Sequence, residues 1–208
     1  MKTRSVRTIF LFTAAASVLN LLLSLLFVLR LPDRVPTHFD ENWVCDGYGS
    51  RWTALITAFL PLLFLPVLPV LTKKHPENAK PNAVMCLMMT VYLIGLNWMM
   101  LQVSSQDVQL GEQADALAIS WLLPLLFAFM LIAVGNYMPI MQPNGTMGVR
   151  IKWTMENENC WRVTHRFAGR LWVVTGLIMA AIIVISMLCK VQDRLWMLIL
   201  LFEAVTVD

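Results

Sequence analysis

The chain has 208 residues, of which 58% are hydrophobic and 14% are charged, and its formal net charge is +3. This composition, with a mean hydropathy of +0.67, excludes an ordinary soluble domain, whose surface would require more charged side chains. So small a net charge gives no reason to expect direct binding to nucleic acid. We therefore predict an all-α fold in the form of a polytopic transmembrane helical bundle.

Long apolar runs predict about six membrane spans. The first five are expected at residues 9–29, 53–71, 83–103, 117–137 and 171–189. The first run, of 21 residues, is longer than the core of a signal peptide and fits an uncleaved span. A sixth span over residues 194–208 would have only 15 residues, so this helix is either short and tilted or truncated.

Prolines interrupt the second expected span at Pro61, Pro66 and Pro69. We expect this span to be kinked, and we expect neighbouring helices to satisfy the carbonyl groups that the kinks free. Residues 31–52, which follow the first span, are expected to form a polar loop because charges and turn residues are frequent there. The chain then divides into an amino-terminal two-span region, residues 1–82, and a second region, residues 83–208, which holds the remaining spans.

The Lys and Arg residues are distributed unequally between the two sides of the predicted bundle. Five lie on the side of the first loop: Arg30, Arg34, Arg51, Lys190 and Arg194. Eleven lie on the side of the N-terminus: Lys2, Arg4, Arg7, Lys73, Lys74, Lys80, Arg150, Lys152, Arg162, Arg166 and Arg170. Because basic loops stay inside, this distribution predicts that the N-terminus and residues 144–170 are cytoplasmic and that the first loop is outside.

The stretch from Asn144 to Trp172 combines aromatic, basic and polar residues between two apolar runs. Helical periodicity is expected to place Trp161 and His165 on one face, and Thr154 can cap the helix that leads into the fifth span. These groups are read as interfacial anchors, as a hydrogen-bonded cap, or as a docking surface for an anionic ligand or a protein. The candidate residues are Asn144, Arg150, Trp153, Thr154, Trp161, His165 and Arg166.

The loop after the first span is the second candidate site, on the opposite side of the membrane. It combines acidic and aromatic residues, which would attract a hydrophobic cationic peptide, although solvated charges and an interfacial aromatic belt are the simpler interpretation. Its carboxylates and its one imidazole lack a fixed spacing, so no metal site is predicted. The candidate residues are Pro36, His38, Phe39, Asp40, Trp43 and Asp46.

Three polar residues are expected inside the membrane: Asn97, Asn136 and Glu203. Asparagines in spans most often join helices by hydrogen bonds, whereas an acid about ten residues into a span usually has a partner or a role. We find no nucleophile with an adjacent base and no paired acids, so no catalytic residue and no cofactor is predicted.

Two sets of residues carry a resemblance to known families. The later set resembles the SdpI family of bacterial membrane proteins, and its matching positions are Gly135, Asn136, Asn144, Gly148, Arg150, Trp153, Thr154, Trp161, Thr164, His165, Arg166 and Gly169. The earlier set is similar to a small membrane domain of unknown function that often precedes it, and its matching positions are Leu31, Pro32, Val35, Pro36, His38, Phe39, Gly47 and Ser50.

The resemblance implies a multi-pass protein of the bacterial plasma membrane that gives immunity to a secreted, membrane-active peptide toxin. It also implies that such a protein can sense the toxin and hold a cytoplasmic transcriptional repressor at the membrane. The implied partners are thus membrane lipids, the peptide toxin and that repressor. Two alternatives stay open: a membrane enzyme or transporter that acts on a lipid or small solute through His165, Arg150 and Arg166, and a purely structural role for both motifs.

Overall fold

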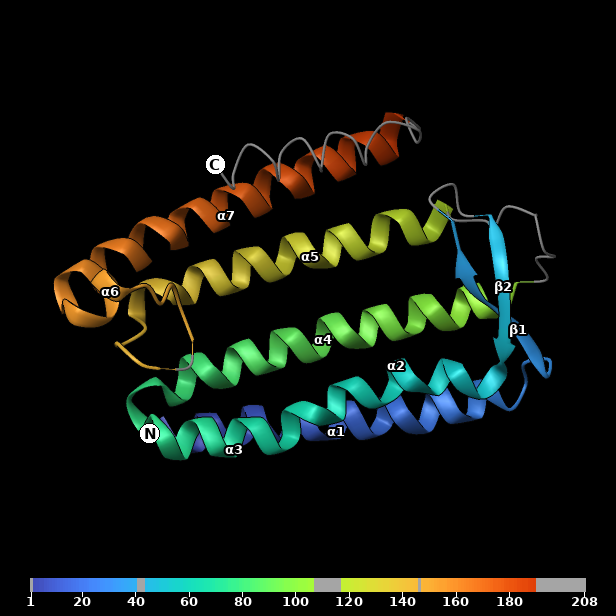
Figure 1. Cartoon of the computed structure of the whole chain (residues 1–208), viewed down its shortest axis with the longest axis horizontal. Helices are drawn as coiled ribbons and strands as arrows, with labels where there is room; N and C mark the ends of the chain where they lie inside the picture. Colours follow the sequence, from blue (N-terminus) through green and yellow to red (C-terminus); the bar gives the residue numbers. More distant parts are fainter. Residues whose placement is uncertain (1, 41–43, 107–116, 146, 190–208) are drawn as a thin grey trace.

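The computed structural model describes residues 2–40, 44–106, 117–145 and 147–189, which form a bundle of long helices with a small hairpin at one end (Figure 1). Four helical segments are long and apolar enough to cross a membrane, namely Arg4–Val28, Arg51–Lys74, Pro76–Ser104 and Glu158–Leu188, and Pro124–Ile140 is a shorter apolar helix. The predicted helical membrane bundle is confirmed. The expected sixth span, with Glu203, lies outside the described residues.

The first and third expected spans are the continuous helices α1 (Lys2–Val28) and α4 (Ala79–Ser104), and the fourth and fifth are α5 (Leu117–Tyr137) and α7 (Glu158–Cys189). Short elements connect them: the 3-10 turns η1 (Arg51–Ala54), η2 (Leu60–Leu63), η3 (Pro76–Asn78) and η4 (Met138–Ile140), and the helix α6 (Lys152–Glu156). A helix of 32 residues such as α7 is about 48 Å long, so it exceeds the roughly 30 Å of a bilayer core.

The second span is broken in the way that its prolines predict. It consists of α2 (Leu55–Phe59), the 3-10 turn η2 and α3 (Phe64–Lys74), and Pro61 lies within the turn. Two side chains of α1 donate hydrogen bonds to carbonyl oxygens of this irregular region. Asn20 donates to Ala58 and Ser17 donates to Pro61, and the donor–acceptor distance is 3.4 Å in both. A neighbouring helix therefore satisfies groups that would be costly to expose to lipid.

Buried polar side chains also join α1, α2 and α4. The Asn97 side chain is fully buried, and its Nδ2 donates to the Asn20 Oδ1 over 3.2 Å and to the Ser24 Oγ over 2.8 Å. Its Oδ1 accepts a 3.0 Å hydrogen bond from the Thr57 hydroxyl. Asn97 thus links three helical segments through one amide, because both its donor hydrogens and its acceptor are used.

The helices α5 and α7 pack against each other through backbone contact at glycines. A Cβ on Gly135 would lie 2.7 Å from the Gly169 carbonyl oxygen, and a Cβ on Gly169 would lie 2.6 Å from the Gly135 carbonyl oxygen. Further along, a Cβ on Gly176 would lie 2.7 Å from the Ala128 carbonyl oxygen. Small residues at a helix crossing allow this close approach, which compensates for the lack of a hydrophobic driving force in lipid.

Residues 31–52, expected as a polar loop, instead contain an antiparallel hairpin of β1 (Arg34–Phe39) and β2 (Cys45–Ser50). The expectation of a loop was wrong because a proline interrupts β1 and the strand register is irregular between Pro36 and His38, which hides the alternation of a strand. One face of the hairpin is nevertheless apolar: Val35 is fully buried and packs with Val28 and Leu101 of the bundle.

Candidate functional site

The two ends of the bundle carry the two groups of candidate residues. The start of α1, the turn between α3 and α4, and the segment between α5 and α7 lie together at one end, and the hairpin lies at the other (Figure 1). The first end carries eleven Lys and Arg residues, and we call it the basic end. At the other end, the hairpin packs through β1 on an apolar cluster that includes Val28, Val35 and Leu101.

Trp161 and His165 form the centre of the basic end. Trp161 is 1% exposed and His165 is fully buried, and the two rings stack with centroids 3.9 Å apart and planes inclined by 18°. The indole Nε1 donates to the Met141 carbonyl oxygen over 2.9 Å. The one-turn spacing on α7 therefore places both rings against the segment that follows α5, as helical periodicity predicts.

Both nitrogens of the His165 ring are used within the protein. The Val149 backbone N–H donates to Nε2 over 3.1 Å, so this nitrogen carries no proton. Nδ1 lies 2.8 Å from the Trp161 carbonyl oxygen and must be the donor in that pair. His165 is therefore a neutral ring that fixes a loop to a helix, and neither nitrogen is left to exchange a proton with a substrate.

Gly148 makes the turn above this ring. Its φ of 109° is in the region that favours glycine, and a Cβ there would collide with the His165 Nε2 and come within 3.1 Å of the Trp161 indole. Two independent constraints, backbone conformation and space, therefore require glycine at this position.

The Thr154 side chain stabilises the start of the short helix α6. It does not cap the helix that leads into the fifth span, as had been expected. Its Oγ1 accepts from the Ile151 N–H over 3.0 Å and donates to the Val149 carbonyl oxygen over 2.7 Å. The cap of α7 is Asn157, whose Oδ1 accepts from the Cys160 N–H over 3.0 Å. The break between α6 and α7 moves the N-terminus of the long helix to Glu158.

Two asparagines hold the intervening loop. The Asn144 Oδ1 accepts from the Met147 N–H over 2.8 Å, and its Nδ2 donates to the Gln142 carbonyl oxygen over 2.9 Å. Asn78, before α4, accepts from the Gln142 N–H over 2.8 Å and donates to the Gln142 carbonyl oxygen over 3.0 Å. Sequence reasoning missed Asn78, because its partner is 64 residues away and no local pattern connects them.

We define the basic-end cap as the buried residues Asn78, Asn144, Thr154, Trp161 and His165 together with the backbone of residues 141–145 and 147–153. The other candidates at this end are exposed: Trp153 is 71% exposed, and Arg150 and Arg166 also face out of the protein. Arg150 still donates to the Gly145 carbonyl oxygen. The candidate set therefore divides into a buried structural group and an exposed group that a partner could reach.

At the hairpin end, His38 and Asp46 are paired across the strands. The His38 Nδ1 lies 2.5 Å from the Asp46 Oδ1, and the side chains are 73% and 49% exposed. Asp40 accepts from the Val44 N–H over 2.9 Å and so stabilises the turn. Pro36 is buried, and Phe39 is half-buried against Met99 and Val103.

The remaining candidates have different surroundings. Asn97 is buried among three helices, whereas Asn136, at the end of α5, is exposed. Trp43 and Glu203 lie outside the described residues. Within residues 2–40, 44–106, 117–145 and 147–189, no three His, Cys, Asp or Glu side chains are close enough to hold a metal ion.

Comparisons with known proteins match two separate parts of the chain. Residues 140–207 match the SdpI/YfhL protein family, and residues 15–68 match a domain of unknown function (DUF1648). The chain is 28% identical to the immunity protein SdpI of Bacillus subtilis (strain 168) over 164 residues, which cover 79% of this chain and 76% of the relative. No solved structure matches the chain. The resemblance seen in the sequence is thereby confirmed: the chain is similar to SdpI-family membrane proteins, with a DUF1648 match that precedes the SdpI/YfhL match.

Proposed function

We propose that this protein is an integral membrane immunity protein that protects a bacterium against a secreted, membrane-active peptide toxin. The observation that carries the proposal is the similarity to the immunity protein SdpI of Bacillus subtilis, which extends over 79% of the chain. The protein lies in the plasma membrane with the basic end in the cytoplasm, as the excess of Lys and Arg at that end favours.

The hairpin end is the proposed place of contact with the toxin. It offers exposed acids at Asp40 and Asp46 next to exposed aromatic surface at Tyr48 and Trp52. A hydrophobic cationic peptide would be attracted by the carboxylates and would bury its apolar residues against the rings. The hairpin packs on the bundle through Val35, so contact here reaches α1 and α4 directly.

The first experiment expresses the chain in a toxin-sensitive bacterium and measures survival when the peptide is added. We expect protection by the native chain and an about tenfold loss of protection for a variant with His38→Gln and Asp46→Asn. Asp33→Asn is the matched control, since Asp33 is also an exposed acid of this end but lies at the base of the hairpin. No protection by the native chain at normal membrane levels would remove the proposed function.

The exposed group at the basic end is the proposed surface for a cytoplasmic repressor. Trp153 and Arg166 combine an exposed aromatic ring with an exposed guanidinium, two side chains that often dominate protein interfaces. His165 is buried, so it would act only by holding this surface in place.

Recruitment is tested by co-purifying cytoplasmic proteins with the native chain and with a Trp153→Ala, Arg166→Ala variant, in the presence and absence of toxin. We expect the toxin-dependent partner to be lost from the variant, while thermal stability stays within about 0.5 kcal/mol because both side chains are exposed. Unchanged recruitment by the variant would contradict the assignment of this surface. Lys152→Ala, an exposed neighbour, is the control.

The alternative of an enzyme or transporter centred on His165 finds little support in the geometry. Both ring nitrogens are occupied by backbone groups, and Arg166 is exposed on another face of α7. A catalytic base needs a free nitrogen within reach of its substrate. A His165→Gln variant that keeps its fold and retains protection would support the structural role of this ring.

A further inference from the structure

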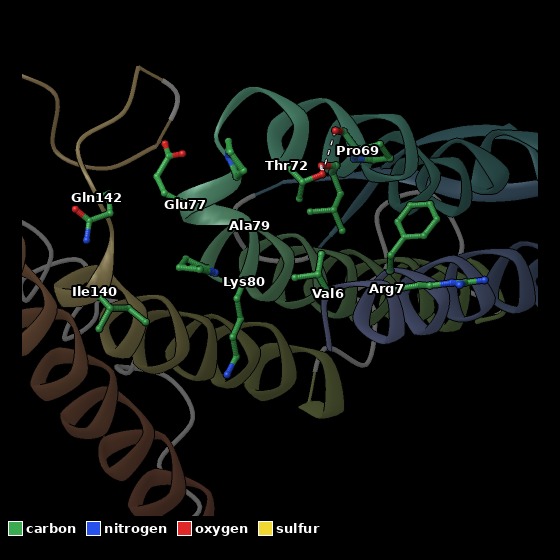
Figure 2. A pocket seen from close by; sticks show the side chains of 13 residues that line it. Val6, Arg7, Pro69, Thr72, Glu77, Ala79, Lys80, Ile140 and Gln142 are labelled. Carbon is green, nitrogen blue, oxygen red and sulfur yellow. Dashed lines mark hydrogen bonds between the residues drawn. The ribbon is translucent and has the colours of Figure 1, made fainter. Parts of the chain in front are cut away.

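A cavity of about 600 Å³ lies at the basic end, among α1, α3, α4 and the segment after α5. Figure 2 shows side chains from these elements around it, with Val6 and Arg7 from α1, Pro69 and Thr72 from α3, and Gln142 from the later segment. This volume is in the range of sites for small organic molecules. None of the candidate residues named from the sequence lines the cavity.

The walls of the cavity are mostly apolar. Val6 and Phe10 line it from α1, Leu68 and Pro69 from α3, and Ile140 from η4. Such a surface would not retain a free inorganic anion, because an ion loses hydration there without gaining partners. The occupant therefore needs a hydrocarbon part.

The charged lining residues are mainly basic. Arg7 of α1 and Lys80 of α4 line the cavity and are both exposed, and in Figure 2 their side chains extend in different directions from it. Glu77 is the acid of the described lining, so the two basic residues outnumber it. The occupant therefore carries a negative group at one end.

The position of the cavity identifies the class of occupant. The lining residues come from the second turn of α1, the last turns of α3 and the first turn of α4, which is the level at which the spans leave the membrane. Phospholipid phosphates lie at this depth, with acyl chains directly below. Basic pockets between helices on the cytoplasmic side are suited to anionic lipid headgroups.

We propose that this cavity binds one anionic phospholipid, whose headgroup lies at the level of Arg7 and Lys80 and is attracted by their charges, while an acyl chain lies along Phe10 and Leu68. The bound lipid would contact the DUF1648 segment through Leu68 and the SdpI/YfhL segment through Ile140 and Gln142. It would therefore join the two parts of the chain. This inference is independent of the proposed immunity, because it requires no toxin and no cytoplasmic partner.

The test uses the full chain in nanodiscs that contain phosphatidylglycerol and phosphatidylcholine in equal amounts, followed by native mass spectrometry. We expect one retained phosphatidylglycerol on the native chain. An Arg7→Gln, Lys80→Gln variant should retain about tenfold less, since both positive charges of the cavity lining are removed. A Leu68→Gln variant should also lose the lipid, because the acyl chain would meet a polar side chain.

The matched control is Lys73→Gln, Lys74→Gln, which removes two positive charges from the same end of the protein at residues outside the cavity lining. Its retention of phosphatidylglycerol should change less than twofold. Equal losses in both double variants would overturn the proposal, since general electrostatic attraction would then explain binding. Equal retention of phosphatidylcholine, or displacement of the lipid by inorganic phosphate, would overturn it as well.

Discussion

Asn78 holds the backbone of Gln142 by two hydrogen bonds, one to its N–H over 2.8 Å and one from its side-chain amide to the carbonyl oxygen over 3.0 Å. Asn78 is fully buried and precedes α4, whereas Gln142 follows α5 and leads into the basic-end cap. The Asn78 side-chain amide thus pairs with one N–H and one carbonyl oxygen of the other loop, as the backbone of a neighbouring β-strand would. The folding of the cap is coupled through it to the turn between α3 and α4.

Replacement of Asn78 by alanine leaves the Gln142 N–H without its partner and removes one of the two side-chain donors to the Gln142 carbonyl, which keeps Asn144. We expect the free energy of unfolding to fall by about 1–3 kcal/mol, the cost of an unsatisfied buried polar group. Thermal unfolding in detergent measures this loss of stability. In limited proteolysis, the variant should be cut within residues 141–153 faster than the native chain. Asn159→Ala is the control, because Asn159 is exposed, and an equal loss in both variants would contradict the prediction.

A comparison of two glycines tests the turn over His165. Gly148→Ala should destabilise the protein by about 1–3 kcal/mol, because alanine is strained at a φ of 109° and its Cβ collides with the imidazole. Gly145→Ala, three residues earlier, should be nearly neutral, since nothing lies within 4 Å of a Cβ there. The difference between the two melting temperatures checks the prediction, and similar values would refute it.

The crossing of α5 and α7 predicts a large effect of one methyl group. Gly169→Ala should lower the melting temperature strongly, because a Cβ would lie 2.6 Å from the Gly135 carbonyl oxygen and 2.9 Å from Pro139. Gly95→Ala on α4 is the matched control: its Cβ meets only the end of the Leu126 side chain, which can rotate away. If Gly95→Ala proves the more destabilising change, the close crossing is not important for stability.

The buried amide of Asn97 provides the fourth prediction. Asn97→Ala should reduce the free energy of unfolding by about 1–3 kcal/mol, since Thr57, Asn20 and Ser24 lose a partner inside the bundle. Asn136→Ala should stay within about 0.5 kcal/mol, because Asn136 is exposed. Denaturation in mixed detergent with increasing sodium dodecyl sulfate measures both variants under the same conditions.

The helices could be predicted from the sequence because hydrophobic length alone identifies membrane spans. The fourth expected span, residues 117–137, has the same bounds as α5, and the prolines of the second span predicted its break. The spacing of Trp161 and His165 by one helical turn also predicted their common face of α7, on which the two rings stack. These features depend on local periodicity, which the sequence displays directly.

The parts that could not be predicted depend on long-range partners or on irregular backbone. Asn78 and Gln142 are 64 residues apart, and the hairpin register is irregular around Pro36, so neither has a local pattern. Burial was equally hidden: His165 and Arg166 are neighbours in the sequence, yet one is fully buried and the other is exposed. A list of polar residues therefore could not separate the structural group from the accessible one.

The 3-10 turn η2 lengthens the second span. Its four residues, Leu60–Leu63, rise by about 2.0 Å each, compared with 1.5 Å in an α-helix. The turn therefore makes this span about 2 Å longer than an unbroken α-helix of the same residues would be. Because α1 and α4 are unbroken beside it, the second span gains this length relative to its two neighbours without additional residues.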